Sequence, residues 1–252
     1  MPEAPQTKAR RGRPQPRVPA LEPIDASLAT PMDRQVYQRL REALMSGRFA
    51  PASSLSSRSI ASALGISAQP VRDALKRLEA DGVLESRPQS GFYLRSPASD
   101  EYREIIDIRQ RLEGLACRIA ASAADRAFIA ELREINGRLF EAEEKGKYSL
   151  EKNYRFHFLI YRHAGRATLL STIENFWVRV GPSLHYYPTT FDETTTMAKH
   201  SDIIEALARG DGPGAEAAMI ADLENGASLI IPRLPEGATA GGFVRGISKL
   251  WP

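Results

Sequence analysis

Apolar positions at helical spacing occur in two separate blocks of the chain, and each block predicts a helical domain. The first block opens with an amphipathic stretch over residues 32–48, whose inward positions include Val36, Leu40 and Leu44. Apolar residues that lie three or four positions apart share one face of a helix. We therefore expect a first helix that Gly47 closes, since glycine readily adopts the left-handed conformation that ends many helices.

Two shorter helices are predicted next, because each has a serine at its start and a glycine at its end. Ser56 or Ser57 can cap the first of them, which Gly65 stops. Ser67 can cap the second, which Gly82 ends. The second helix has an apolar face at helical spacing, formed by Val71, Ala74, Leu75 and Leu78.

Two extended runs complete the first block. Residues 83–85 and 92–95 are joined by the basic, turn-rich segment 86–91, which predicts a β-hairpin. Two helices across a sharp turn, followed by a basic hairpin, are typical of a winged helix-turn-helix. In that arrangement the second helix enters the major groove of DNA and the hairpin lies along the DNA backbone.

The stretch from Leu55 to Leu94 resembles the DNA-binding domain of GntR-family bacterial transcription regulators. Its LSSRSIASALGISAQPVRDALKRLEADGVL follows the family pattern L-S-x-R-x-L-A-x-x-L-G-V-S-R-x-P-V-R-x-A-L-x-x-L-x-x-x-G-L-V, and a glycine-containing wing comes next. Ala68 stands where the family usually has an arginine that contacts DNA. Gln69 and Arg72 therefore become the main candidates for DNA contacts at the start of this helix. The resemblance implies that DNA is contacted by Arg58, Ser67, Gln69, Arg72, Lys76, Arg87 and Gly91.

The second block contains helical patterns only, with neither a strand pattern nor a glycine-rich phosphate loop. The expected helices cover residues 101–124, 126–145, 150–164, 168–187, 195–209 and 213–231. The first of them has apolar residues at helical spacing, namely Ile105, Ile108, Leu112, Leu115, Ile119 and Ala120, which we expect to face inward. Six helices with short connections predict an all-α bundle.

The predicted fold class is therefore mainly α, with an N-terminal winged helix-turn-helix of three helices and a small hairpin, and a C-terminal bundle of six to seven helices. We expect residues 1–30 to be a disordered basic tail because they are rich in proline, alanine and arginine. The winged domain then covers residues 31–96, a linker covers 97–100 and the helical domain covers 101–231. Residues 232–252, rich in glycine and proline, are expected to form a C-terminal tail.

Charge and cysteine content favour an intracellular DNA-binding protein. The net charge of the 252 residues is only +3, but the basic residues gather near the N-terminus, which points to a polyanionic partner. Within that tail, Arg11-Gly12-Arg13-Pro14 resembles the core of an AT-hook, which binds narrow A·T minor grooves; the alternative is a solvated tail that only attracts phosphates. The single cysteine, Cys117, and the lack of an apolar run of ~20 residues indicate a cytoplasmic protein with no membrane span.

Four polar residues of the helical block form a second constellation of interest. Asn153 and His157 lie four positions apart on one predicted helix, and His200 and Asp222 lie on two later ones. These stretches resemble the FCD ligand-binding domain of the FadR subfamily of GntR regulators, in which an aspartate and three histidines often bind a divalent metal that helps to hold an organic-acid effector. Asn153 stands at the family's aspartate and Asp222 at its last histidine.

The altered set still suits Zn²⁺, Ni²⁺ or Mn²⁺, although the amide oxygen is a weaker donor than a carboxylate. The alternative is a degenerate site that binds an effector through hydrogen bonds without metal. A metal-assisted hydrolase needs a base beside the metal, and no glutamate lies near these histidines in such a motif. The pattern therefore favours a sensor site over a catalytic one.

Arg109 is the candidate anchor for an anionic effector, because its planar guanidinium can bind a carboxylate through two hydrogen bonds. It lies in a stretch that resembles the family's x-x-R-x-x-L-E, whose arginine often faces the effector pocket. The alternative is a surface arginine that pairs with Glu113 one turn later. Aromatic residues that can line the pocket are Tyr154, Trp177, His185 and Tyr186.

Together these features predict a cytoplasmic homodimer that binds double-stranded DNA at an inverted repeat, since a two-fold dimer reads a two-fold site. A small carboxylate bound at the metal site is expected to release it from DNA, which would make it a repressor and not an enzyme. Two alternatives remain: a metal-dependent enzyme that acts on a small acid, and an architectural protein that binds DNA without sequence preference.

Overall fold

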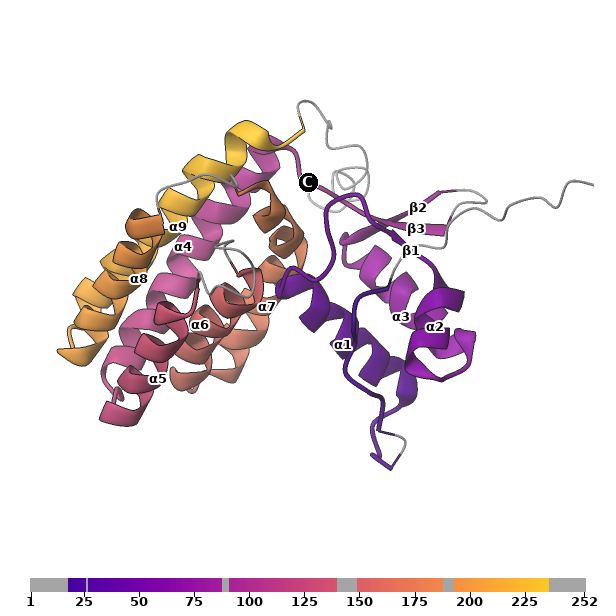
Figure 1. The fold of residues 1–252 in the computed structure, drawn as a ribbon, viewed down its shortest axis with the longest axis horizontal. Coiled ribbons are helices and arrows are strands. Elements are labelled where there is room, and N and C mark those ends of the chain that lie inside the picture. Colours follow the sequence, from indigo (N-terminus) through magenta and orange to yellow (C-terminus); the bar gives the residue numbers. More distant parts are fainter. Residues whose placement is uncertain (1–17, 26, 88–90, 140–148, 188–192, 236–252) are drawn as a thin grey trace, which may run out of the picture.

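The computed structural model describes residues 18–25, 27–87, 91–139, 149–187 and 193–235. These residues form a winged domain and a helical domain, which lie side by side in Figure 1. The fold class predicted from the sequence is confirmed. The proposed AT-hook segment, residues 11–14, lies outside the described residues, and so does most of the predicted C-terminal tail.

The winged domain packs three helices against a small sheet, and the sheet has one strand more than predicted. Its elements are α1 (Met32–Met45), β1 (Ser54–Leu55), α2 (Ser57–Leu64), α3 (Ala68–Ala80), β2 (Leu84–Arg87) and β3 (Gly91–Leu94). The strand order is β1-β3-β2, with both pairs antiparallel. The sequence gives little signal for β1, because two residues are too few to show an alternating pattern.

The predicted turn residues behave as expected at α2 and α3, with one exception. Ser56 caps α2 by accepting a hydrogen bond from the backbone N–H of Ser59, and Gly65 ends the helix in the left-handed conformation with φ 66°. Ser67 occupies the N-cap position of α3, but its side chain makes no capping hydrogen bond. The predicted core residues Val71, Ala74, Leu75 and Leu78 are buried.

Residues 18–25 pack against the folded domain, although the sequence predicted a disordered tail over residues 1–30. Val18, Leu21 and Ile24 pack against the hydrophobic core, and the backbone oxygen of Ala20 accepts a hydrogen bond from Arg48. The expectation of disorder was therefore wrong for this segment. Its apolar residues are too few to show a period, and only packing against α1 and its neighbours gives them a partner.

The helical domain contains six α-helices in its described part, as predicted, and α4 is the central one. They are α4 (Ser99–Ala121), α5 (Arg126–Gly137), α6 (Leu150–His163), α7 (Ala167–Val180), α8 (Glu193–Ala208) and α9 (Gly212–Ile230). Helix α4 packs against α6, α7, α8 and α9. Figure 1 shows α4 and α9 side by side along the length of the domain.

Several boundaries of helices, linker and tail differ between the prediction and the structure. The linker is shorter than residues 97–100, because α4 already begins at Ser99. The predicted helix 168–187 is two elements, since α7 ends at Val180 and a 3₁₀ helix, η2 (Gly181–Tyr186), follows with Pro182 in its first turn. A second 3₁₀ helix, η3 (Ile231–Arg233), follows α9, and Leu234 after it is buried, so the C-terminal tail starts later than residue 232.

One face of α4 contradicts the sequence prediction. Ile108 and Leu115 were expected to face inward, but their side chains are 37% and 44% exposed. Leu112 and Ile119, on the same face, are only partly buried. Ile105 and Ala120 are buried as predicted, and the rest of the core face of α4 is formed by Tyr102, Ile106, Ala116 and Cys117. Helix α4 therefore has two apolar faces, of which only one is covered by the described residues.

The two domains touch through α1 on one side and α7 and η2 on the other. The guanidinium of Arg41 donates to the side chain of Asn175 at 3.0 Å, and a ring nitrogen of His185 lies 2.7 Å from the backbone oxygen of Gly47. Gly181 lies so close to α1 that an added Cβ would come within 2.6 Å of the Leu44 backbone oxygen. In the described part of the chain, no helix is long and apolar enough to span a membrane.

Candidate functional site

The predicted DNA-contacting residues lie on exposed faces of the winged domain. Gln69, Arg72 and Lys76 are exposed on α3, and Arg58 is exposed on α2. The side-chain amide of Gln69 donates to the Asp73 carboxylate, and Arg72 donates to the Gln69 oxygen at 3.2 Å. The sequence reading missed Asp73, which holds Gln69 and Arg72 in one hydrogen-bonded cluster on the outer face of the helix.

The wing carries the two remaining predicted residues near its tip. Arg87 is the last residue of β2 and pairs with Gly91, the first residue of β3. The guanidinium of Arg87 donates to the Glu85 carboxylate and lies 4.4 Å from the centre of the Tyr93 ring, so both described partners belong to the hairpin itself. Residues 88–90, between the strands, lie outside the described part of the chain.

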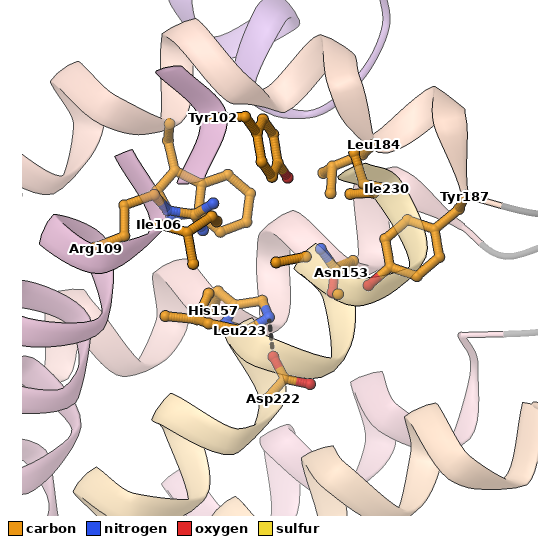
Figure 2. A pocket seen from close by; sticks show the side chains of 13 residues that line it. Tyr102, Ile106, Arg109, Asn153, His157, Leu184, Tyr187, Asp222, Leu223 and Ile230 are labelled. Carbon is orange, nitrogen blue, oxygen red and sulfur yellow. Dashed lines mark ion pairs between the residues drawn. The ribbon is translucent and has the colours of Figure 1, made fainter. Parts of the chain in front are cut away.

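In the helical domain, three buried side chains converge from three helices. His157 comes from α6, His200 from α8 and Asp222 from α9, and one ligand atom of each lies within 4.8 Å of the others. The Asp222 carboxylate lies 3.4 Å from Nε2 of His157 and 3.6 Å from Nε2 of His200. Figure 2 shows His157 and Asp222 pointing toward one another at one end of the pocket.

The fourth predicted ligand, Asn153, lines the same pocket and is buried. It lies on α6 one turn before His157, so both side chains project from the same face of that helix. The structure thus brings His157, His200 and Asp222 together and places Asn153 in the lining of the adjoining pocket, as the resemblance to the FCD domain led us to expect.

Burial sets the charge of this cluster. Loss of water lowers the pKa of His200 to about 3, and it lowers the pKa of His157 well below its usual value, with His200 and Arg109 adding to the effect. Both imidazoles are therefore neutral at pH 7, as a metal ligand must be. Burial also raises the pKa of Asp222 to about 7, because the ionised carboxylate has lost its water and lies near Glu113.

The surroundings of His200 indicate that the cluster can hold a divalent cation. Both ring nitrogens of His200 are buried without a hydrogen-bond partner among the described residues. The ring stacks on Phe156 with centroids 4.0 Å apart, which fixes its orientation. A buried polar atom without a partner is costly, and a metal ion with imidazole and carboxylate ligands would remove that cost for Nε2, the nitrogen that lies 3.6 Å from Asp222.

The pocket beside this cluster has a polar end and an apolar end. Its cavity volume is about 30 Å³, which accommodates an ion with water, so a larger ligand requires the lining to move. The apolar end is lined by Ile106, Leu184, Leu223, Ala227 and Ile230. Of the aromatic residues proposed from the sequence, Trp177 lines the pocket, whereas Tyr154, His185 and Tyr186 do not.

Two tyrosines that the sequence reading missed also line the pocket. Tyr102 comes from the first turn of α4, and Tyr187 follows η2. Figure 2 shows the Tyr187 hydroxyl pointing toward Asn153, and it lies so close to α9 that a Cβ added at Gly226 would come within 2.7 Å of it. Neither tyrosine belongs to a motif, and only the packing of the ends of α4 and η2 against α9 brings them here.

Arg109 lines the pocket, but its positive charge is already paired with the carboxylate of Glu113. Its guanidinium donates from Nε to Oε1 of Glu113 at 2.5 Å and from a terminal nitrogen to Oε2 at 3.2 Å. Both residues are buried, so the alternative of a surface pair was right about the partner and wrong about the exposure. Glu113 also accepts hydrogen bonds from the Trp177 indole and the Tyr161 hydroxyl.

Comparison with known proteins gives two matches that together cover most of the chain. Residues 32–94 match the family described as bacterial regulatory proteins, gntR family, and residues 104–225 match the FCD domain. The sequence is 34% identical over 154 residues to the HTH-type transcriptional regulator McbR of Escherichia coli strain K12, a match that covers 60% of this chain and 70% of McbR. It is 29% identical over 202 residues to the HTH-type transcriptional repressor RspR of the same strain, which covers 77% of this chain and 86% of RspR.

Solved structures agree with these matches. The structure of E. coli McbR/YncC superposes with a TM-score of 0.71 at 27% identity, covering 81% of this chain and 98% of that one. A putative GntR transcriptional regulator from Rhodococcus sp. RHA1 superposes with a TM-score of 0.65 at 20% identity, covering 81% and 99%, which supports the fold alone. Both resemblances noted in the sequence are thereby confirmed.

Proposed function

The chain belongs to the GntR family of bacterial transcription regulators, and we propose that it is a homodimeric repressor which a small carboxylate releases from its operator. Membership of the family itself makes the chain a DNA-binding transcription regulator. The relatives named above are likewise regulators and not enzymes. The proposal that a small carboxylate controls DNA binding is supported by the buried cluster of His157, His200 and Asp222 beside a pocket.

Helix α3 is the proposed recognition element. Its exposed Gln69 and Arg72 are suited to base edges, and Lys76, Arg58, Ser67 and the wing residues Arg87 and Gly91 are suited to the phosphate backbone. Ala68 leaves the hydrogen-bonded cluster of Gln69, Arg72 and Asp73 as the polar group nearest the start of the helix. The operator is proposed to be an inverted repeat, read by two copies of α3 in successive major grooves.

The metal site is proposed to hold Zn²⁺, Ni²⁺ or Mn²⁺ through His157, His200 and Asp222, with the amide oxygen of Asn153 as a fourth ligand. A bound divalent ion would supply positive charge at the polar end of the pocket. Its role is to attract and orient an anion, and the chain's own side chains would hold the rest of the effector.

The charges around the pocket support a carboxylate effector, but they assign its attraction to the proposed metal ion and not to Arg109. Arg109 was expected to bind the effector directly, but its charge is balanced by Glu113 inside the protein. The divalent ion exceeds the single charge of Asp222 by one, so the site as a whole favours a single negative charge. The apolar end of the pocket favours a carboxylate that carries a compact apolar body.

Dimer formation is proposed to use the exposed apolar face of α4. Ile108 and Leu115 are two helical turns apart, so two antiparallel copies of α4 that cross near Leu112 would place each Ile108 against the other copy's Leu115. The same crossing brings the acidic Glu104 and Asp107 of one copy toward the basic Arg111 and Arg118 of the other. This self-complementary charge pattern favours a second copy of the chain over a different partner. The dimer is expected to work in the cytoplasm, where its operator lies.

The test combines metal content with DNA release. Protein purified without chelator is expected to contain about one divalent ion per chain, and a His157→Ala, His200→Ala double variant is expected to contain none. His163→Ala is the matched control, because His163 is not part of the cluster: its half-buried ring stacks on Phe128 and lies 2.9 Å from the Ala123 backbone oxygen. An operator fragment selected from random DNA should be released by a short-chain carboxylate from the metal-loaded wild type and not from the double variant.

Equal affinity for selected and random DNA would contradict the proposal and support an architectural protein. Equal metal content in the wild type and the double variant would reject the metal site while leaving the DNA-binding assignment intact.

A further inference from the structure

We infer that Tyr161 is a positioning residue which, together with Glu113, fixes the tautomer of His157 and so presents the Nε2 lone pair of that ring to the metal. This inference concerns the site of the proposed function, and its first readout does not need metal. It begins from a chain of buried groups that runs from Arg109 through Glu113 and Tyr161 to His157.

The direction of each hydrogen bond follows from the chemistry of the partners. Glu113 is fully buried and receives four donors: Nε and a terminal nitrogen of Arg109, the indole N–H of Trp177 and the hydroxyl of Tyr161. Guanidinium and indole groups only donate, and the two contacts with the charged Arg109 guanidinium form an ion pair in which Glu113 is a carboxylate that only accepts. The single proton of the Tyr161 hydroxyl is therefore committed to Glu113.

Tyr161 consequently meets His157 as an acceptor. Its oxygen lies 3.1 Å from Nδ1 of His157 and has no second proton to give, so Nδ1 must carry the proton. A neutral imidazole carries one proton, and Nε2 is then left as a lone pair. That nitrogen is the one that lies 3.4 Å from Asp222 and faces the metal site.

Arg109 acquires a different role in this arrangement. Its two hydrogen bonds to Glu113 hold the carboxylate in place, and its guanidinium also stacks 4.6 Å from the Trp177 ring, which supplies another donor to the same carboxylate. Arg109 thus orients the acceptor of the Tyr161 proton. Groups that orient the second nitrogen of a metal-binding histidine affect metal affinity without touching the metal.

The variant Tyr161→Phe tests the inference, because it keeps the ring and removes only the hydroxyl. Without that acceptor, the Nδ1 proton of His157 has no partner, whereas a proton on Nε2 can be donated to Asp222. We expect the ring to move from the Nδ1–H to the Nε2–H tautomer, which places a proton where the metal must bind. Zinc affinity should fall about 10- to 100-fold.

The tautomer is measured by ¹⁵N NMR of the full-length, metal-free protein, in which each of the four histidines is assigned by substitution. Zinc affinity is measured by competition with a chromophoric chelator. The control is Tyr154→Phe, another buried hydroxyl on α6, which contacts Arg162 instead of His157 and should change neither readout.

A wild-type His157 in the Nε2–H form, or a Tyr161→Phe variant with an unchanged tautomer, overturns the inference. If zinc binds to neither protein while the tautomer changes as expected, the positioning role stands and the proposed metal site fails. The two failures are therefore distinguishable.

Discussion

At the residue scale, the candidate ligand set differs from the family pattern that the sequence resembles, which has an aspartate at the position of Asn153 and a histidine at that of Asp222. The Asp222 carboxylate lies within 3.6 Å of both imidazoles. The proposed set therefore still contains one carboxylate, which is carried by α9 and not by α6, the helix of His157.

The raised pKa of Asp222 predicts that metal binding weakens as the pH falls. The metal needs the ionised carboxylate, and a proton competes for it below the pKa of about 7, whereas both imidazoles stay neutral throughout this range. Zinc affinity is expected to fall about tenfold from pH 8 to pH 6, because one proton must leave. Asp222→Asn has no such proton and should bind more weakly at pH 8, with little pH dependence. An equal slope in both proteins would show that another group titrates.

Arg72 predicts a second effect at this scale, on DNA recognition. Arg72→Ala should weaken operator binding by ~1–3 kcal/mol and relax the base preference at one position of each half-site, because a base contact carries sequence information. Lys76→Ala, one turn later on the same exposed face, should weaken binding to all sequences alike. Fluorescence anisotropy with a set of singly substituted operators measures both. Unchanged affinity in Arg72→Ala would mean that α3 is not the element that reads bases.

At the scale of the element, α4 serves three purposes with three of its faces. Its inward face packs against α6, α7 and α9, its buried pair of Arg109 and Glu113 supports His157, and its outward face exposes Ile108 and Leu115. A helix of 23 residues has more than six turns, so different turns can meet different neighbours. The contrast between the two apolar faces favours an assembly contact on the outer one.

The exposed face predicts that a charge on it breaks the dimer. Leu115→Glu combined with Ile108→Glu should shift the protein from dimer to monomer at micromolar concentration, because two like charges would face two others across the two-fold axis. Analytical ultracentrifugation measures the shift. The matched control is Leu28→Glu, which changes a leucine that is 52% exposed and lies on a different element. A dimer that survives the double change would place the contact on another surface.

At the scale of the whole molecule, the pocket and the DNA-binding domain share one short element. The 3₁₀ helix η2 contributes Leu184 to the pocket, and its neighbour His185 contacts the Gly47 backbone beyond α1. Arg179 at the end of α7 pairs with Glu101, which also pairs with Arg95 at the end of β3. A ligand that displaces Leu184 therefore acts on the same segment that holds the two domains together, which is a physical route for effector-dependent release.

Gly181 predicts how firmly the domains are docked. In Gly181→Ala, the new Cβ would lie 2.6 Å from the Leu44 backbone oxygen and 3.0 Å from Met45 Cα, so backbone must move. We expect a stability loss of about 1–3 kcal/mol and faster proteolysis near residues 96–98. Gly137→Ala is the control, since nothing lies within 4 Å of its added Cβ and alanine favours the end of α5. Thermal denaturation and limited proteolysis measure both effects, and equal behaviour of the two variants would show that the contact is loose.

The sequence by itself determined whatever depends on local chemistry. Helical spacing placed the helices, because a helix with one apolar stripe repeats every 3.6 residues wherever it packs. Ser56 and Gly65 set the ends of α2 through a side-chain hydrogen bond and a left-handed backbone, which need only neighbouring residues. The four candidate ligands were found because their stretches resemble family motifs, and in the structure Asn153, His157 and Asp222 line one pocket while His200 joins His157 and Asp222 in the adjacent cluster.

Only the tertiary structure decided which face of a helix meets which neighbour. Periodicity reports that Ile108 and Leu115 share an apolar face of α4, but it does not say that another face is the one covered. The i, i+4 spacing allowed Arg109 to pair with Glu113, yet its burial and its link to His157 depend on Tyr161 and Trp177 from other helices. Tyr102 and Tyr187 reach the pocket for the same reason: contacts between distant segments follow from how the elements pack, and no local pattern records them.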